Sequence, residues 1–178
     1  MKHIRDVTVI KNAFPKEWKD DYMKLLETPN SDWIRYPTKH ILYEGPKISN
    51  TALGDKWRNY AFAEWKDMFG IEYEPKEDLI MKDNIYWGDF ILQFKEDHYL
   101  APHYDKYNPD EFRFNVLLQK PIGGGLYNIN KKTVPLEEGD MVVFAPYHNL
   151  HQTDKIIGNR NRVVLSLCFR QNYIKGII

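Results

Sequence analysis

The chain has 178 residues, of which 43% are hydrophobic and 28% are charged, a composition typical of one folded domain rather than a disordered segment. Its 25 Lys and Arg residues balance its 25 Asp and Glu residues, so it lacks the positive excess expected of a dedicated nucleic-acid binder. The apolar runs are too short to cross a bilayer, no basic-then-apolar leader opens the sequence, and its single cysteine excludes an internal disulfide and a multi-cysteine metal site. We therefore expect one cytoplasmic domain with no nucleic-acid or membrane partner.

The chain opens with a predicted strand at residues 6–11, followed by a helical pattern after Pro15. Pro29 and Asn30 are turn-forming residues, so the helix is predicted to end before them. The residues that recur at helical spacing are Phe14, Trp18, Tyr22, Leu25 and Leu26.

A second helix is predicted over residues 55–69, with Gly70 in position to cap its C-terminal end. Residues 30–50, between the two helices, are rich in turn-forming residues and predict no regular element. The residues expected on the buried face of the second helix are Trp57, Ala61, Trp65 and Met68.

Beyond residue 79 the apolar residues alternate at the short period of β-strands, and turn signals rich in Gly, Pro, Asn and Asp separate the runs. Many short strands at this spacing favour an antiparallel sandwich or small barrel. We predict a mainly β domain over residues 1–178, in which residues 1–79 give helical support and residues 80–178 form the β-core. The predicted strands are residues 90–95, 99–103, 113–119, 126–129, 140–144 and 162–172.

Four of the six histidines lie between residues 98 and 151, inside the predicted β-core. His103, Tyr104 and Asp105 form the single His-x-Asp motif of the sequence. Because residues i and i+2 of a strand point to the same face, His103 and Asp105 can bind one metal ion together. Imidazole and carboxylate are both common metal ligands, so the motif predicts two ligands of a metal site.

A third ligand is expected from the segment after the apolar strand at residues 140–144, which contains His148 and His151. Two imidazoles and one carboxylate on one side of a metal leave the other side open, an arrangement typical of non-haem Fe(II) oxygenases. Zinc is the alternative, since similar ligand sets form catalytic zinc sites and His98 or His148 could add a fourth ligand.

Arg162 opens the last predicted strand and can direct its guanidinium into the same barrel as the metal. The planar guanidinium binds a carboxylate through two parallel hydrogen bonds, which lysine cannot do. A metal triad together with such an arginine suits a dicarboxylate cosubstrate, and Arg160 is the alternative for this role.

These motifs resemble the 2-oxoglutarate/Fe(II)-dependent dioxygenases of the compact prolyl 4-hydroxylase-like type. The resemblance is strongest over residues 90–170, and the predicted first strand and helix are also similar to the family's. It implies a double-stranded β-helix, or jelly-roll-like core, backed by two or more helices. The matching features are the His103–Asp105 motif, the strand FRFNVLLQ, the turn at residues 123–125, the run LEEGDMVVF, His151, Gly158 and Arg162.

The resemblance implies that His103, Asp105 and His151 bind Fe(II), with His148 as the alternative to His151. It also implies that Arg162 binds the distal carboxylate of 2-oxoglutarate, and that no other side chain takes part in catalysis. Two tyrosines common in the family are replaced here by Phe94 and Gln119, so Asn115 and Gln119 are expected to supply the remaining hydrogen bonds to the cosubstrate.

The activity implied by this resemblance is hydroxylation of a C–H bond with O2, in which 2-oxoglutarate yields succinate and CO2. The substrate would be a prolyl residue in a peptide or a small molecule. Two alternatives stay open: a cupin-like metal-binding protein or enzyme that does not use 2-oxoglutarate, and a β-barrel binding module without catalysis. The excess of Lys over Arg points to an AT-rich bacterial or phage source, and the sequence gives no indication of oligomeric state.

Overall fold

The computed structural model describes most of the chain and gives the positions of its helices and strands. The described residues are 5–27, 33–37, 42–49, 51–72, 79–80, 86–106, 109 and 111–171. Their helices are the short 3-10 helix η1 (Lys16–Trp18), α1 (Lys19–Lys24) and α2 (Ala52–Phe69). Their strands are β1 (Thr8–Ile10), β2 (Trp33–Pro37), β3 (Leu42–Pro46), β4 (Ile71–Glu72), β5 (Leu79–Ile80), β6 (Tyr86–Trp87), β7 (Phe90–Phe94), β8 (Leu100–His103), β9 (Glu111–Gln119), β10 (Gly123–Gly124), β11 (Tyr127–Ile129), β12 (Lys132–Val134), β13 (Met141–Phe144), β14 (His151–Thr153), β15 (Ile156–Ile157) and β16 (Arg162–Gln171).

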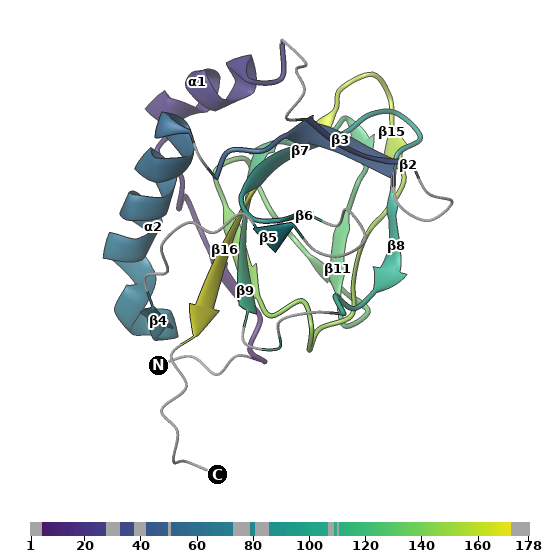
Figure 1. Ribbon diagram of the computed structural model, residues 1–178. Helices are drawn as coiled ribbons and strands as arrows, with labels where there is room; N and C mark the ends of the chain where they lie inside the picture. Colours follow the sequence, from purple (N-terminus) through teal and green to yellow (C-terminus); the bar gives the residue numbers. More distant parts are fainter. Residues whose placement is uncertain are drawn as a thin grey trace.

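Two antiparallel sheets face each other, and α2 covers the outer face of the larger one (Figure 1). The large sheet has the order β1-β13-β9-β16-β7-β3-β2, with β4 also paired to β16. The second sheet has the order β12-β11-β14-β8, and β10–β15 and β5–β6 form two-stranded ribbons. The predicted mainly β fold with N-terminal helices is therefore confirmed.

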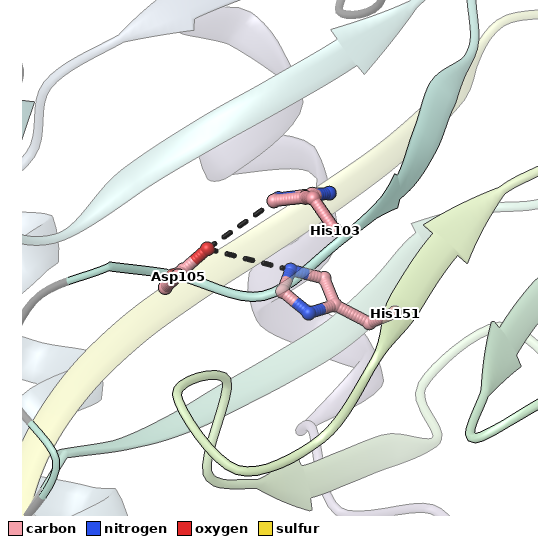
Figure 2. Close-up of side chains that lie close together, drawn as sticks. All are labelled: His103, Asp105 and His151. Atoms are coloured by element: carbon pink, nitrogen blue, oxygen red, sulfur yellow. Dashed lines mark ion pairs between the residues drawn. The ribbon is translucent and has the colours of Figure 1, made fainter.

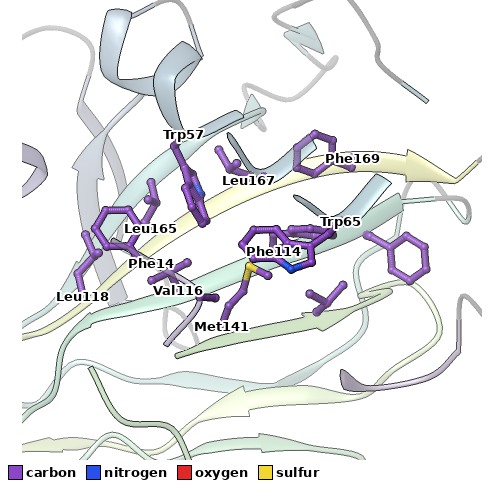
Figure 3. Close-up of a cluster of buried hydrophobic side chains, with 14 of the residues drawn as sticks. Phe14, Trp57, Trp65, Phe114, Val116, Leu118, Met141, Leu165, Leu167 and Phe169 are labelled. Atoms are coloured by element: carbon purple, nitrogen blue, oxygen red, sulfur yellow. The ribbon is translucent and has the colours of Figure 1, made fainter. Parts of the chain in front are cut away.

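Strand β9 divides the interior into two regions because its side chains alternate between the two faces of the large sheet. Phe114, Val116 and their neighbours on one face join a core with α2 (Figure 3). Leu117, on the other face, packs with Tyr127 and Ile129 of the second sheet. The face of β9 that carries Arg113, Asn115 and Leu117 therefore lines the space between the sheets.

The second helix begins three residues earlier than predicted, at Ala52. The Thr51 side chain caps it by accepting a hydrogen bond from the Gly54 N–H at 3.0 Å. Gly70 ends it in the left-handed conformation at φ 61°, as predicted. The expectation that Met68 is buried was wrong: Met68 is 43% exposed and Phe69 is fully buried instead. Phe69 continues the i, i+4 series that runs through Trp57, Ala61 and Trp65, so its side chain falls on the core face.

The first helix is shorter than its apolar pattern indicated. It consists of η1 and α1 and ends at Lys24, and Pro29 and Asn30 lie outside the described residues. Residues 30–50, which predicted no element, contribute β2 and β3 to the edge of the large sheet. Residues before 80 thus supply four strands of this sheet as well as the helices, and the assignment of all 178 residues to one domain stays a prediction.

All six strands predicted after residue 79 are present, with bounds that differ by one or two residues. The additional short strands, such as β12, β14 and β15, have two or three residues each and depend on their partners in the sheet. No helix of the described residues is long and apolar enough to cross a membrane.

Candidate active site

The His-x-Asp motif and His151 meet in the space between the two sheets. His103 is the last residue of β8, Asp105 follows in the loop, and His151 is the first residue of β14. Register pairing of β8 with β14 places His103 directly opposite His151. Asp105 lies beyond the end of the strand rather than on it, and its N–H donates to the Pro146 carbonyl at 3.1 Å.

The three side chains converge on one point (Figure 2). Asp105 Oδ1 lies 3.4 Å from His103 Nε2 and 3.6 Å from His151 Nε2. The ligand atoms all lie within 4.8 Å of one another, which suits coordination of a single ion. Among the described residues, no other group of three or more His, Cys, Asp or Glu side chains converges in this way.

Each imidazole is oriented by a backbone carbonyl. His103 Nδ1 lies 2.8 Å from the Ala101 carbonyl oxygen, and His151 Nδ1 lies 3.1 Å from that of Asn149. Because a carbonyl only accepts, Nδ1 carries a hydrogen in both rings. A metal would therefore bind at Nε2, where on His103 it would take the place of the proton that this ring shares with Asp105 in the metal-free protein. Both Nε2 atoms are the ones that face Asp105.

A pair of asparagines, the buried Asn149 and the exposed Asn130, stabilises the turn before His151. Asn149 is 1% exposed, its Nδ2 donates to the Ala145 carbonyl at 2.9 Å, and its Oδ1 accepts from Asn130 Nδ2 at 2.7 Å. Asn130 also accepts from the Leu150 N–H at 3.1 Å, with its own backbone at φ 52°. This turn therefore fixes where β14 begins and where His151 points.

The electrostatics keep the carboxylate ionised and one imidazole neutral. Burial raises the pKa of Asp105, but the hydrogen bond with His103 and neighbouring positive charges outweigh burial and hold the pKa below its usual value. Burial lowers the pKa of His103, but its bonds to Asp105 and Ala101 outweigh burial and raise it. Burial lowers the pKa of His151 to about 4. An ionised carboxylate and a neutral imidazole are the forms that bind metals.

The alternative histidines lie elsewhere. His148 Nε2 lies 2.9 Å from the Pro109 carbonyl and is not part of the converging group. His98 is also outside this group, and its Nδ1 is buried without a hydrogen-bond partner among the described residues. His3 and His40 lie outside the described residues.

Arg162 and Arg160 occupy different environments. Arg162 is 4% exposed, and its guanidinium carbon lies 5.5 Å from the centre of the Phe94 ring and 5.4 Å from that of Tyr127. No carboxylate pairs with it within the described chain, and burial lowers its pKa to about 10. Arg160 is on the surface, where its Nη2 binds Glu138 Oε1 at 2.8 Å. Of the two candidates, Arg162 is the one positioned to bind an incoming carboxylate.

The predicted partners of the cosubstrate, Asn115 and Gln119, differ in availability. Gln119 Nε2 already donates to the Asn161 carbonyl at 2.9 Å. Asn115 Oδ1 is buried without a partner among the described residues, and its Nδ2 lies 3.5 Å from the Tyr127 hydroxyl. The roles of both residues toward a cosubstrate stay predictions.

Tyr127 is a site residue that sequence reasoning missed. It is 5% exposed, lies under the Arg162 guanidinium and reaches Asn115 with its hydroxyl. A tyrosine therefore does lie beside the arginine, but it comes from β11 of the opposite sheet rather than from the positions of Phe94 and Gln119. The strand containing Tyr127 was predicted, whereas its contact with Arg162 depends on how the sheets face each other.

Arg113 is a second missed residue, on the face of β9 that lines this space. Its Nε pairs with Glu111 Oε1 at 2.7 Å, and its Nη1 donates to the Gly88 carbonyl at 2.9 Å. The charge of Arg113 is one of those that lower the pKa of Asp105. Nothing in the sequence around Arg113 indicated that this residue of an apolar strand would lie near the metal ligands.

No family model matches the chain, and no curated protein is significantly similar to it in sequence. Solved structures are similar in fold. A prolyl-4-hydroxylase from Pseudomonas putida aligns with a TM-score of 0.66 and 12% identity, over 94% of this chain and 94% of that one. HygX from Streptomyces hygroscopicus, solved with nickel and 2-oxoglutarate bound, aligns with a TM-score of 0.66 and 11% identity, over 96% of this chain and 84% of that one.

A third similar structure is SnoN, a non-haem α-ketoglutarate-dependent epimerase from nogalamycin biosynthesis. It aligns with a TM-score of 0.66 and 13% identity, over 94% of this chain and 79% of that one. At these identities the similarities establish the fold. The chain has the double-stranded β-helix fold of the 2-oxoglutarate/Fe(II) oxygenases. The fold implied by the sequence motifs is therefore confirmed.

The side chains present fit the metal and the cosubstrate that this fold implies. Two imidazole nitrogens and one carboxylate oxygen on one side of an ion form the facial ligand set of non-haem Fe(II) sites, which leaves positions for a 2-oxo acid. The buried Arg162, with no carboxylate partner in the described chain, supplies a complementary charge for the distal carboxylate.

Proposed function

We propose that the protein is an Fe(II)- and 2-oxoglutarate-dependent dioxygenase that hydroxylates a C–H bond and releases succinate and CO2. The observation that carries this proposal is the convergence of His103, Asp105 and His151 in the same interior space as the buried Arg162. The similarity in fold to 2-oxoglutarate oxygenases supports it.

In this proposal the two imidazoles and the carboxylate hold Fe(II) and leave its other side open. When bound, Fe(II) would activate O2 for attack on a C–H bond, with the 2-oxo acid as the co-reductant that is decarboxylated. Arg162 orients the cosubstrate by pairing with its distal carboxylate. Phe144, whose ring centre lies 5.2 Å from that of His151, helps to exclude water from the ligands.

The substrate proposed is a prolyl residue in a peptide or a small molecule. The Pseudomonas putida neighbour is named as a prolyl-4-hydroxylase, which supports the first, and the neighbour from nogalamycin biosynthesis supports the second. Tyr104 and Tyr147 flank the hydrogen bond between Asp105 and Pro146 and are 53% and 41% exposed. We propose that these exposed rings help to bind the peptide or ring of the substrate.

The alternative was a cupin-like metal protein that does not use 2-oxoglutarate. Such a protein has no need of a buried arginine without a carboxylate partner, so Arg162 favours the oxygenase. We also propose a cytoplasmic location, which the single cysteine supports.

Decarboxylation of 2-oxoglutarate labelled at C1 tests the proposal. Labelled CO2 would be measured with Fe(II), first without substrate and then with proline-containing peptides and free amino acids. We expect release that depends on Fe(II), is abolished in His151→Ala and is retained in His148→Ala, the matched control three residues away. Equal release from the two variants would contradict the proposed ligand set, and a compound that stimulates release would identify the substrate class.

A further inference from the structure

One turn, at residues 145–149, anchors two of the three metal ligands. The Asp105 N–H donates to the Pro146 carbonyl at 3.1 Å, and His151 Nδ1 lies 3.1 Å from the Asn149 carbonyl oxygen. Asp105 comes from the loop after β8 and His151 from the start of β14, and their side chains point toward each other in Figure 2. The shape of this turn therefore sets where the carboxylate and the imidazole lie relative to each other.

The turn depends on the side chain of Asn149. This residue is 1% exposed, and its Nδ2 donates to the Ala145 carbonyl at 2.9 Å. The backbone N–H groups of His148 and Asn149 donate to the same carbonyl, each at 3.1 Å. The carboxamide thus ties the last residue of the turn to its first, and its own buried oxygen needs a donor in turn.

That donor comes from Asn130, which follows β11 at the surface. Asn130 Nδ2 donates to Asn149 Oδ1 at 2.7 Å, and Asn130 Oδ1 accepts from the Leu150 N–H at 3.1 Å. The Asn130 N–H also donates to the Leu150 carbonyl at 2.7 Å. Each of the two carboxamides uses both its donor and its acceptor, so a carboxylate at either position would set two oxygens against each other.

We propose that Asn149 and Asn130 are positioning residues that act through this turn on Asp105 and His151 and so set the affinity of the site for its metal. The inference rests on the proposed function, because it takes these two side chains as metal ligands. Both carboxamides are engaged with each other and with the backbone, so they act on the ligands rather than on the ion. Outer contacts that orient metal ligands typically contribute about tenfold to a hundredfold in metal affinity.

Two variants break the carboxamide pair in different ways. Asn149→Asp keeps the shape of the side chain but turns an oxygen toward the Ala145 carbonyl. Asn130→Gly removes the donor to Asn149 and keeps the backbone at φ 52°, a conformation that glycine adopts readily. We expect each variant to raise the dissociation constant for Mn(II) about tenfold to a hundredfold. Asn130 is exposed, so its variant decides the question if Asn149→Asp does not fold.

Two control variants separate positioning from stability. Asn12→Gly makes the same substitution at another exposed residue with a left-handed backbone, φ 50°, next to β1 of the large sheet, which carries none of the metal ligands. Thr51→Ala removes the cap of α2, so it should lower the melting temperature without changing the site. Both controls should bind Mn(II) as the wild type does.

The test is calorimetric titration with Mn(II) well below the melting temperature of each variant. The visible absorption spectrum of the Co(II)-saturated protein, which reports the ligand geometry, is recorded beside it. We expect this spectrum to change in Asn130→Gly and to match that of the wild type in Asn12→Gly and Thr51→Ala. A purely structural role would lower the melting temperature of Asn130→Gly and leave both its dissociation constant and its spectrum unchanged.

The outcomes separate this inference from the function on which it rests. If Asn130→Gly binds Mn(II) as tightly as the wild type, or if Thr51→Ala weakens binding as much, the inference is wrong while the ligand set stands. A Co(II) spectrum of Asn130→Gly identical to that of the wild type would equally count against it. If the wild type itself does not bind Mn(II), the proposed function fails.

Discussion

Replacing Arg162 with Met should stabilise the protein in the absence of cosubstrate. The guanidinium is buried without a carboxylate partner in the described chain, and burial lowers its pKa from 12.5 to about 10. At about 1.4 kcal/mol for each unit of pKa, keeping the group charged in the folded state costs about 3–4 kcal/mol. At pH 7 the arginine is charged in both the folded and the unfolded chain, so the folded state carries this whole cost.

Methionine has a similar length and no charge, so the variant removes the cost but also loses the contacts of the guanidinium with Phe94 and Tyr127. Contacts of this kind contribute about 0.5–1 kcal/mol each, which leaves a net gain of about 1–3 kcal/mol. The same variant should bind 2-oxoglutarate at least about a hundredfold more weakly, because a paired charge is lost. Stability would therefore increase as cosubstrate binding decreases.

The assay is urea unfolding at 25 °C without metal or cosubstrate, with Arg160→Met as the matched control. Arg160 pairs with Glu138 on the surface, so its replacement should change the free energy of unfolding by less than about 0.5 kcal/mol. A loss of more than about 1 kcal/mol in Arg162→Met would refute the reasoning, since it would mean that the charge is compensated in the folded chain.

Three further predictions concern the frame of the site and its metal. Asp140 accepts hydrogen bonds from Lys11 and two backbone N–H groups; burial raises its pKa, but these bonds outweigh burial and lower it below 3.8. Asp140→Asn should therefore lose about 2 kcal/mol at pH 7, and the difference from the wild type should shrink as the pH falls below about 4 through the lowered pKa. Asp89→Asn, which leaves the buried Arg58 guanidinium without its charged partner, should lower the free energy of unfolding by about 3–5 kcal/mol in urea. Mn(II) at about a hundred times its dissociation constant should raise the melting temperature by roughly 5–10 °C, and the rise should be absent in His103→Ala.

Each of these has a control or a result that would count against it. Glu137→Gln, in an exposed pair with Lys120, should leave the pH dependence unchanged, and an Asp140→Asn difference that is constant from pH 7 to pH 3 would contradict the role of the ionised carboxylate. If Asp89→Asn unfolds at the urea concentration of the wild type, the buried pair does not stabilise the fold. If Mn(II) also raises the melting temperature of His103→Ala, the ion binds at another site.

The sequence predicted those parts of the fold that local patterns determine. The apolar run after Arg162 and the alternation around Asn115 predicted the long strands β16 and β9, and the helical stripe with Gly70 predicted α2. The His-x-Asp motif gave two of the three converging side chains, because its spacing alone brings them together. The strand pattern alone predicted an antiparallel sandwich or small barrel, and the double-stranded β-helix came from the resemblance to the oxygenase family.

Features that depend on contacts between distant segments could not be predicted. Strand β14 has three residues and exists through pairing with β8 and β11, which are far from it in sequence. The same pairing turns Thr153 toward the interior and places Tyr127 beside Arg162. Strands β2 and β3 contain Pro37, Gly45 and Pro46, residues typical of turns, so the sequence did not indicate strands there. The two strands pair with each other, and β3 also pairs with β7.

Anaerobic titration of the protein with Fe(II) and 2-oxoglutarate tests the central claim most directly. A 2-oxo acid chelated to Fe(II) gives a weak visible charge-transfer band that requires both the metal and the cosubstrate. We predict a band in the wild type and in Arg160→Ala, no band in His103→Ala, and a band in Arg162→Ala only at far higher cosubstrate concentration. If the wild type binds iron but gives no band, the claim is contradicted and a metal protein that does not use 2-oxoglutarate is favoured. If the wild type binds no iron, the claim is also contradicted and a binding module without catalysis is favoured.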